Sequence, residues 1–163
     1  MLNKRIGIKL YRKLRYRKGY GVHSPFVYNL ITKVLEEKSP YYIFDDIEAE
    51  RSRLLSLRNE IAHITLKEMQ TKGYGALLFR LVNFFKPTVV LQIGCSTGIM
   101  SLYLANGSKD CDYIFLEERE GIFPSESFKQ QQLLERFTLK EGAYSASLND
   151  LIKAIPKVDM IHI

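Results

Sequence analysis

Hydrophobic residues in the second half of the chain follow two alternating periods. Short apolar runs of strand length, rich in β-branched and aromatic residues, occur at 88–93, 113–116, 137–140 and 158–163. Between these runs, apolar residues recur at helical spacing over 99–105, 125–136 and 148–155. Strands that alternate with helices form a parallel sheet, because each right-handed crossover returns the chain to the same end of the sheet. The pattern therefore predicts an α/β fold built on a four-stranded parallel sheet.

The first half of the chain predicts helices and no strand. Ser24 before Pro25 is typical of a helix N-terminus, since serine caps the first turn and proline fits the first helical position. Asp45 or Asp46 can cap a second helix, and a third helical stretch is expected over 60–69. This order places a group of helices before the first strand.

Two glycines mark the change between these halves. Gly73 and Gly75 are expected to interrupt the chain before a strongly apolar helix over 76–86, because glycine is a poor helix former. The chain is thereby divided into two predicted parts. Residues 1–72 are expected to form a basic arm and a helical cap, and residues 73–163 an α/β domain that would contain only its first four strands.

The net charge of +6 is concentrated at the N-terminus. Residues 1–35 contain nine Lys and Arg and no acidic residue, so the remainder of the chain is net negative. The basic arm 1–18, with Tyr11 and Tyr16 among its cations, can bind a nucleic acid by neutralising phosphates and stacking on bases. It can equally be the solvated face of a helix that contacts another subunit. Both interpretations stay open.

Several functional classes are excluded or left without support by the composition. No apolar stretch approaches the roughly 18 residues of a membrane span, and the basic N-terminus lacks the apolar run of a secretory signal. A cytoplasmic protein without a membrane span is expected. Cys95 and Cys111 lack the spacing of a zinc or redox site and are expected to be reduced. His23, His63 and His162 share no metal-ligand spacing, so no metal site is predicted.

The turn after the first predicted strand is the expected ligand site. Ligands of parallel sheets bind beyond the carboxyl ends of the strands, beside the first strand. Gly94 and Gly98 occur there with the spacing G-x-x-x-G, which differs from the G-x-G-x-x-G of dinucleotide-binding turns. Gly94 lets a ligand approach the main chain, and Gly98 lets the next helix pack closely. Glu117, at the end of the second strand, can accept hydrogen bonds from both hydroxyls of a ribose.

In this arrangement residues 74–163 resemble the class I S-adenosylmethionine-dependent methyltransferases, and among them the small-molecule O-methyltransferases. The likeness lies in the helix before the first strand, the turn 94–98, the acid Glu117 and the fourth strand at 158–163. Segment 21–28 also resembles the N-terminal portion of uncharacterised bacterial members.

The resemblance implies a Rossmann-like parallel sheet with the strand order 3-2-1-4, S-adenosylmethionine as the cofactor and a small molecule as the methyl acceptor. It also implies a set of cofactor-binding residues, namely Gln92, Gly94, Cys95, Ser96, Gly98, Glu117 and Ala143. Methyl transfer depends mainly on aligning the acceptor with the sulfonium methyl group, so it does not require a dedicated acid or base. No catalytic residue is assigned, because the sequence shows no pairing of a nucleophile with a base.

Three residues depart from the pattern of the resembled enzymes. Gln92 replaces an acid that organises the turn and the methionine end of the cofactor, and Met100 stands where a serine commonly binds the cofactor carboxylate. Ala143 stands where Asp or Asn often contacts the adenine. An amide offers no charge to an ammonium group, and a thioether is a weak acceptor that cannot donate a hydrogen bond. We therefore expect cofactor binding to be weakened or lost.

The sequence stops after Ile163, where the resembled O-methyltransferases continue toward their metal ligands or base. A fourth strand at the open edge of the sheet is apolar enough to pair with another chain. We expect either the N-terminal part of a longer methyltransferase or a homodimer that covers this edge. The alternative function is a non-catalytic module on a degenerate methyltransferase scaffold, whose basic arm binds RNA or DNA.

Overall fold

The computed structural model divides the chain into two compact units, residues 1–39 and residues 40–163. The residues that it describes are 7, 11, 19, 21–56, 71–95, 97–118, 125–130, 133–155 and 157–163. The helix predicted over 60–69 lies outside them. No helix among the described residues is long and apolar enough to cross a membrane. The division into 1–72 and 73–163 stays a prediction.

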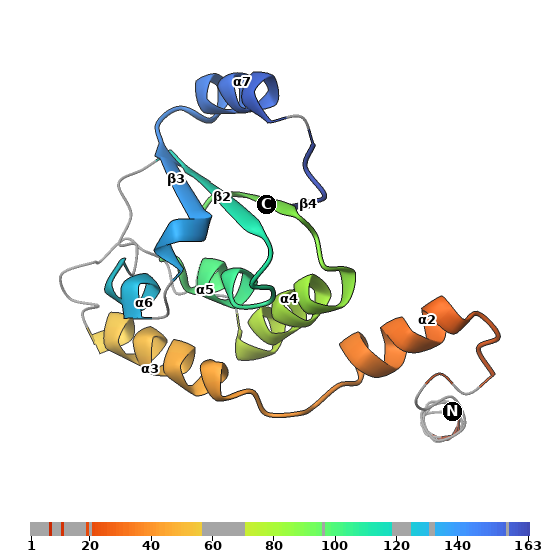
Figure 1. Ribbon diagram of the computed structural model, residues 1–163. Coiled ribbons are helices and arrows are strands. Elements are labelled where there is room, and N and C mark those ends of the chain that lie inside the picture. The colour runs from red at the N-terminus through yellow and green to blue at the C-terminus, as the bar shows by residue number, and fades with distance from the viewer. Residues whose placement is uncertain are drawn as a thin grey trace. The chain divides into compact units, whose positions relative to one another are not determined.

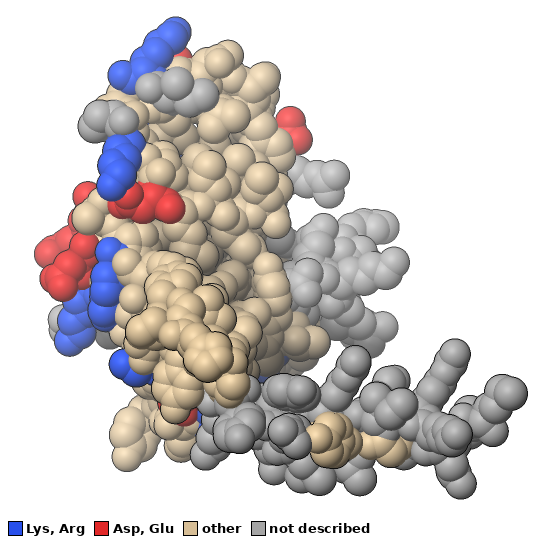
Figure 2. Space-filling model, turned by 90° about the vertical axis from the view of Figure 1, so that its right-hand side faces the viewer, with Lys and Arg blue, Asp and Glu red and all other residues tan. Residues whose placement is uncertain are grey.

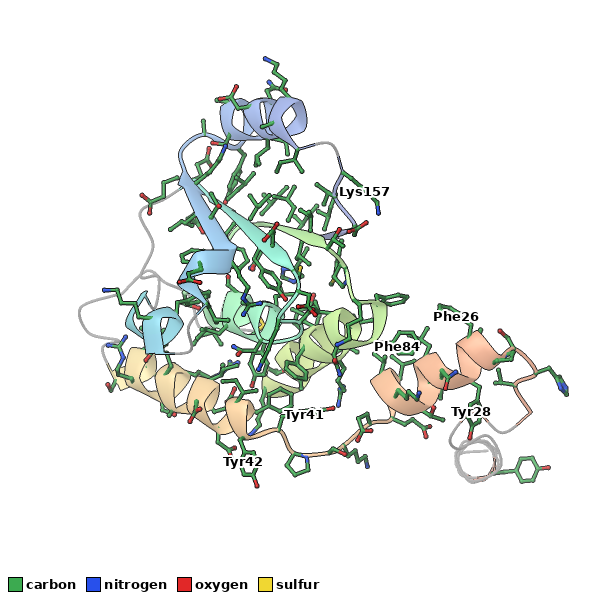
Figure 3. All side chains as sticks on the ribbon, viewed as in Figure 1. Phe26, Tyr28, Tyr41, Tyr42, Phe84 and Lys157 are labelled. Carbon is green, nitrogen blue, oxygen red and sulfur yellow. The ribbon has the colours of Figure 1, made fainter. Side chains whose placement is uncertain are left out.

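The first unit contains a helical segment over residues 25–35. Helix α2 (Pro25–Leu30) continues directly into the π-helical turn η2 (Ile31–Leu35). The predicted cap is confirmed, since the Ser24 side chain accepts a hydrogen bond from the Val27 N–H at 3.4 Å and Pro25 is the first helical residue. Phe26 and Tyr28 are about half exposed on α2 (Figure 3).

The second unit is built on a four-stranded sheet in the order β3-β2-β1-β4. Its strands are β1 (Val89–Ile93), β2 (Asp112–Glu117), β3 (Phe137–Glu141) and β4 (Met160–His162). All three strand pairs are parallel (Figure 1), which confirms the predicted α/β fold and strand order. Because the strands are parallel, their carboxyl ends lie along one edge of the sheet, where the predicted ligand site was placed.

Helices cover both faces of this sheet. The helices are α3 (Tyr42–Ser56), α4 (Lys72–Phe85), α5 (Ile99–Ala105), α6 (Ser125–Gln130), the 3₁₀ turn η3 (Leu134–Arg136) and α7 (Tyr144–Ala154). Val90 and Phe115 face the larger core beneath α3, α4 and α5, whereas Leu91 and Ile114 face α7 (Figure 1). Successive strand residues thus point to opposite faces, and both faces are apolar, as expected of a buried parallel sheet.

Two predicted helix boundaries were wrong. Helix α3 begins at Tyr42, so Asp45 lies in its first turn and does not cap it. Phe44 packs edge-on against Phe79 with ring centroids 5.0 Å apart, and this burial favours helix residues before the acids. Helix α7 likewise begins at Tyr144, four residues before the predicted start, because Tyr144 packs on the smaller core.

The helix predicted over 125–136 is described as α6 and η3, with residues 131 and 132 outside the described part. The fourth strand is shorter than predicted, since β4 begins only at Met160. Asp159, just before it, uses its carboxylate to accept a hydrogen bond from the Thr88 N–H at 2.9 Å. The Asp159 N–H also donates to the Val89 carbonyl at 3.0 Å, so residue 159 is tied to β1 through both its side chain and its backbone.

The glycine pair was predicted to precede a helix, but it lies inside α4. Thr71 caps this helix by accepting a hydrogen bond from the Tyr74 N–H at 3.3 Å, so the helix begins before Gly73. Gly75 is buried, and a β-carbon there would overlap the ring of Tyr103 on α5. The glycine is therefore required for the close approach of α4 and α5, and this packing outweighs its low helix propensity.

Replacing Gly75 by alanine is expected to destabilise the fold by about 1–3 kcal/mol, since the new methyl group overlaps the buried Tyr103 ring. Gly73→Ala is the matched control, because the nearest atom to its β-carbon would be Thr71 Oγ1 at 3.9 Å. That change is expected to be neutral or to stabilise the helix by up to about 1 kcal/mol. Urea denaturation followed by circular dichroism measures both, and equal stabilities would contradict the packing.

Candidate functional site

The turn between β1 and α5 has the backbone geometry that its glycines permit. Gly94 has φ +79° and Gly98 has φ +69°, both in the left-handed region that favours glycine. The Gly98 N–H donates to the Cys95 carbonyl at 2.7 Å, and Gly98 caps α5. The Gly94 N–H donates to the Leu116 carbonyl at 2.8 Å, which ties the turn to β2. Ser96 lies outside the described residues.

The main chain at Gly94 is open to a ligand. Among the described residues, a β-carbon built at Gly94 would have only the Tyr144 hydroxyl within 4 Å, at 3.6 Å. The glycine is therefore not needed to avoid a neighbouring side chain, but for its backbone angle and the bare surface that results.

Glu117 brings a carboxylate to this turn. It ends β2 and is only 7% exposed. Its Oε2 accepts a hydrogen bond from the Cys95 N–H at 2.8 Å, and its Oε1 accepts from the Glu118 N–H at 3.0 Å. Tyr144, at the start of α7, donates its hydroxyl to the same Oε1 at 3.4 Å. These donors compensate the cost of burying a charged group at the edge of the sheet.

The Gln92 side chain is buried and forms hydrogen bonds with other groups of the protein. It is 1% exposed and lies on the face of the sheet that α5 covers. Its Oε1 accepts a hydrogen bond from the Ser101 hydroxyl at 2.8 Å, and its Nε2 donates to the Gly94 carbonyl at 3.3 Å. A carboxylate at this position accepts only, so the amide holds the turn in a way that an acid does not. Met100 is also buried, 5% exposed, in the core.

The third strand ends at the same edge. The Gly142 N–H donates to the Glu117 carbonyl at 2.9 Å, and Gly142 has φ +127°. Ala143 follows as the exposed N-cap residue of α7. The structure therefore brings Gln92, Gly94, Cys95, Gly98, Glu117 and Ala143 to one region.

Burial determines the chemistry of the ionisable groups around the turn. Desolvation, together with the nearby Glu117 carboxylate, raises the pKa of the Cys95 thiol to about 12. The thiol donates weakly to the Leu116 carbonyl at 3.6 Å. Desolvation and the Glu117 carboxylate also raise the pKa of Tyr144. Cys95 is therefore a protonated packing residue at neutral pH and not a nucleophile.

Sequence reasoning missed three residues at this edge. Tyr144 was not predicted as a site residue. The signal for it was its position, since it follows Ala143 in the segment just after the third strand. Tyr74 and His162 were also missed as a pair: the Tyr74 hydroxyl lies 3.1 Å from His162 Nε2, across 88 positions of sequence. Desolvation lowers the pKa of His162, which keeps the ring neutral at neutral pH.

The described residues contain no group of three or more His, Cys, Asp and Glu side chains that could hold a metal ion. Their ionisable groups at the turn are instead engaged with backbone N–H groups and with Tyr144.

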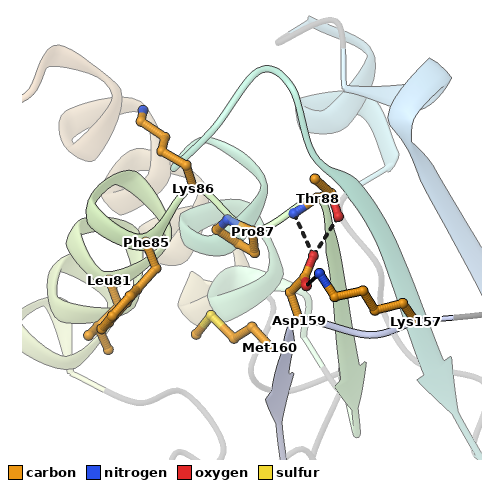
Figure 4. Close-up of a pocket in the computed structure, with 8 residues that line it drawn as sticks. All are labelled: Leu81, Phe85, Lys86, Pro87, Thr88, Lys157, Asp159 and Met160. Carbon is orange, nitrogen blue, oxygen red and sulfur yellow. Dashed lines mark hydrogen bonds and ion pairs between the residues drawn. The ribbon is translucent and has the colours of Figure 1, made fainter.

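A hollow of about 570 Å³ lies at the opposite end of the sheet, where β1 and β4 begin (Figure 4). Apolar residues of α4 form one wall and Met160 another. Asp159 accepts hydrogen bonds from the Thr88 N–H and hydroxyl and pairs with Lys157. The Lys157 ammonium and the Thr88 donors hold the pKa of Asp159 well below its usual range. Asp159, Thr88 and Lys157 are therefore hydrogen-bonded or ion-paired with one another. The hollow lies at the other end of the strands and is not part of the site at the turn.

No family model and no curated protein matches the chain. Solved structures do match. A putative O-methyltransferase from Klebsiella pneumoniae is 22% identical, with a TM-score of 0.60 over 82% of this chain and 56% of that one. The S-adenosylhomocysteine-bound methyltransferase from Podospora anserina is 23% identical, with a TM-score of 0.55 over 71% of this chain and 47% of that one.

A third match is the O-methyltransferase from Bacillus cereus in complex with S-adenosylhomocysteine, which is 20% identical. Its TM-score is 0.54 over 77% of this chain and 53% of that one. The chain spans about half the length of these structures. Together they show that the chain has the α/β fold of these methyltransferases, and its parallel sheet has the strand order 3-2-1-4.

The two thiols are expected to be unreactive in the folded chain. Cys95 and Cys111 are 5% and 2% exposed, and burial raises the pKa of both thiols, so both are protonated at neutral pH. Modification by 5,5′-dithiobis(2-nitrobenzoate) should be at least about 100-fold slower than in guanidinium chloride, where both thiols are exposed. Rapid modification of Cys95 in the folded chain would show that the turn opens readily.

Proposed function

We propose that this chain binds S-adenosylmethionine at the carboxyl edge of its sheet and forms the cofactor-binding part of a methyltransferase for a small-molecule acceptor. One observation carries the proposal: a buried carboxylate, Glu117, lies against a glycine turn whose main chain is bare. Two of the structurally similar methyltransferases are described as bound to S-adenosylhomocysteine, which agrees with it.

The residues present fit the nucleoside part of the cofactor. Glu117 offers two carboxylate oxygens at the end of β2, where ribose hydroxyls can donate to them. Gly94 leaves room above the turn, and the backbone of Gly142 and Ala143 lies on the β3 side, where the adenine is expected. When bound, S-adenosylmethionine supplies an electrophilic methyl group on its sulfonium. Cys95 and Gly98 help to shape the cofactor site through their backbone, since the Cys95 N–H holds Glu117 and Gly98 begins α5.

The residues around the turn orient the ligand and exclude water on the protein side. The Cys95 N–H already bonds to Glu117 Oε2, so the acid is held in place before a ligand arrives. Gln92 holds the other end of the turn to α5. Such preorganisation reduces the entropy lost on binding. The acceptor has no assigned binding residue among the described ones, and alignment with the methyl group is the main requirement of the reaction.

Replacing Glu117 by glutamine is expected to lower the affinity for S-adenosylhomocysteine by about 10- to 100-fold, because the ribose loses charge-assisted hydrogen bonds. Isothermal titration calorimetry on the full chain measures this. Glu118→Gln is the matched control, since Glu118 is the next acid along and is exposed. It should bind as the wild type does.

Two results would count against the proposal. Tight binding that Glu117→Gln leaves unchanged would place the cofactor elsewhere, and absence of binding by the wild type would favour a degenerate scaffold. Thermal denaturation of each variant shows whether a loss of affinity follows from loss of structure.

A second candidate function is nucleic-acid binding through the basic arm. Its support is the concentration of eight Lys and Arg within residues 1–18. On the described surface, basic and acidic side chains are instead interspersed along one margin of the view in Figure 2. The arm is strongly basic and has no acidic residue, so a nucleic-acid contact is expected there.

Two other expectations from the sequence stay predictions. One is that two chains pair through β4, and the other is that the protein is cytoplasmic.

If the arm binds RNA, affinity for a labelled single strand should fall steeply with salt, with a log–log slope of about 0.7 for each phosphate neutralised. Deleting residues 1–18 should abolish binding, because most of the cations of the N-terminal region are removed. Fluorescence anisotropy at several salt concentrations measures both effects. Binding that survives the deletion, or an intact chain that fails to bind at low salt, would reject this candidate.

A further inference from the structure

The geometry of the edge indicates where the amino-acid end of the cofactor would lie, and this step rests on the proposed function. Glu117 ends β2, and Ala143 follows β3 beyond it. A ligand with its ribose on Glu117 and its base beside Ala143 therefore crosses the Gly94 turn in the other direction, away from β3. The strand on that side of β1 is β4. The methionine portion would thus lie toward the end of β4.

Two polar side chains are placed on that side. His162 is the last residue of β4 and is the register partner of Gln92 on β1. Register partners on adjacent parallel strands lie about 4.8 Å apart and point to the same face of the sheet. Tyr74, in the first turn of α4, reaches His162 Nε2 with its hydroxyl at 3.1 Å. Tyr74 is 37% exposed, so the pair borders the surface.

One ring nitrogen of His162 is available for a further contact. Its Nδ1 is buried, and no hydrogen-bond partner for it occurs among the described residues. Buried polar atoms in proteins are nearly always hydrogen-bonded, so this nitrogen is a candidate for a contact with a bound ligand. When the ring proton lies on Nε2 and is donated to the Tyr74 hydroxyl, Nδ1 carries a lone pair. The neutral ring is then an acceptor aligned by Tyr74.

We infer that Tyr74 and His162 form the subsite for the amino-acid end of S-adenosylmethionine, with His162 Nδ1 accepting a hydrogen bond from its ammonium group. Gln92 supports this assignment, because both ends of its amide are used by Ser101 and Gly94 and none of its groups supplies a charge. His162 therefore takes over recognition of the ammonium group. The lowered pKa of His162 agrees, since a protonated ring repels an ammonium ion.

The test compares two ligands by calorimetry on the full chain. S-adenosylhomocysteine has the amino-acid end, whereas 5′-methylthioadenosine has the base, ribose and sulfur without it. His162→Phe should weaken S-adenosylhomocysteine by about tenfold, the loss of one hydrogen bond to a charged group, and leave 5′-methylthioadenosine unchanged. Tyr74→Phe should have the same selective effect but a smaller one, because only the orientation of the ring is lost.

Tyr42→Phe is the control, since Tyr42 is 95% exposed on α3 and should affect neither ligand. A His162→Phe chain that loses affinity equally for both ligands would show a merely structural role and overturn the subsite. Unchanged binding of S-adenosylhomocysteine would also overturn it, while leaving the proposed function intact. A wild type that binds neither ligand overturns the proposed function, and the subsite with it.

Discussion

The hydrogen bond from the Cys95 N–H to Glu117 Oε2 is the contact on which the candidate site depends. It joins the end of β2 to the turn after β1 and accounts for a carboxylate that is almost completely buried. A second tie acts from the other side, where Gln92 links the Gly94 carbonyl to Ser101 of α5. The turn is therefore held both by its neighbouring strand and by the helix that it begins, before any ligand binds.

The parts of this arrangement that follow from chain topology were predictable from the sequence. Parallel strands bring their carboxyl ends to one edge, so an acid at the end of β2 and glycines after β1 were expected to meet there. The partners of those residues were not predictable. Tyr144 and Tyr74 reach Glu117 and His162 only because of where α7 and α4 pack, and hydrophobic periodicity carries no information about such contacts.

Helix boundaries failed for a related physical reason. Local propensity predicted that Gly75 interrupts a helix, but a glycine is required there because Tyr103 packs against it. Propensity likewise predicted Asp45 as a cap, but the helix begins earlier and buries Phe44 in the core. Tertiary packing outweighs propensities of about 1 kcal/mol per residue. Gln92 is a further case in which contacts within the fold explain a residue. Its amide offers no charge to a ligand, but it forms the two hydrogen bonds that hold the turn.

The contact between Asp159 and Thr88 has a consequence for the order of folding. It joins the starts of β4 and β1 across 71 positions of sequence, whereas β1 and β2 begin within about 25 residues of each other. Closing the longer loop costs more chain entropy, and distant pairings form slowly. Strands β1 and β2 are therefore expected to pair early, with β4 docking on an already formed sheet and Asp159 selecting its register.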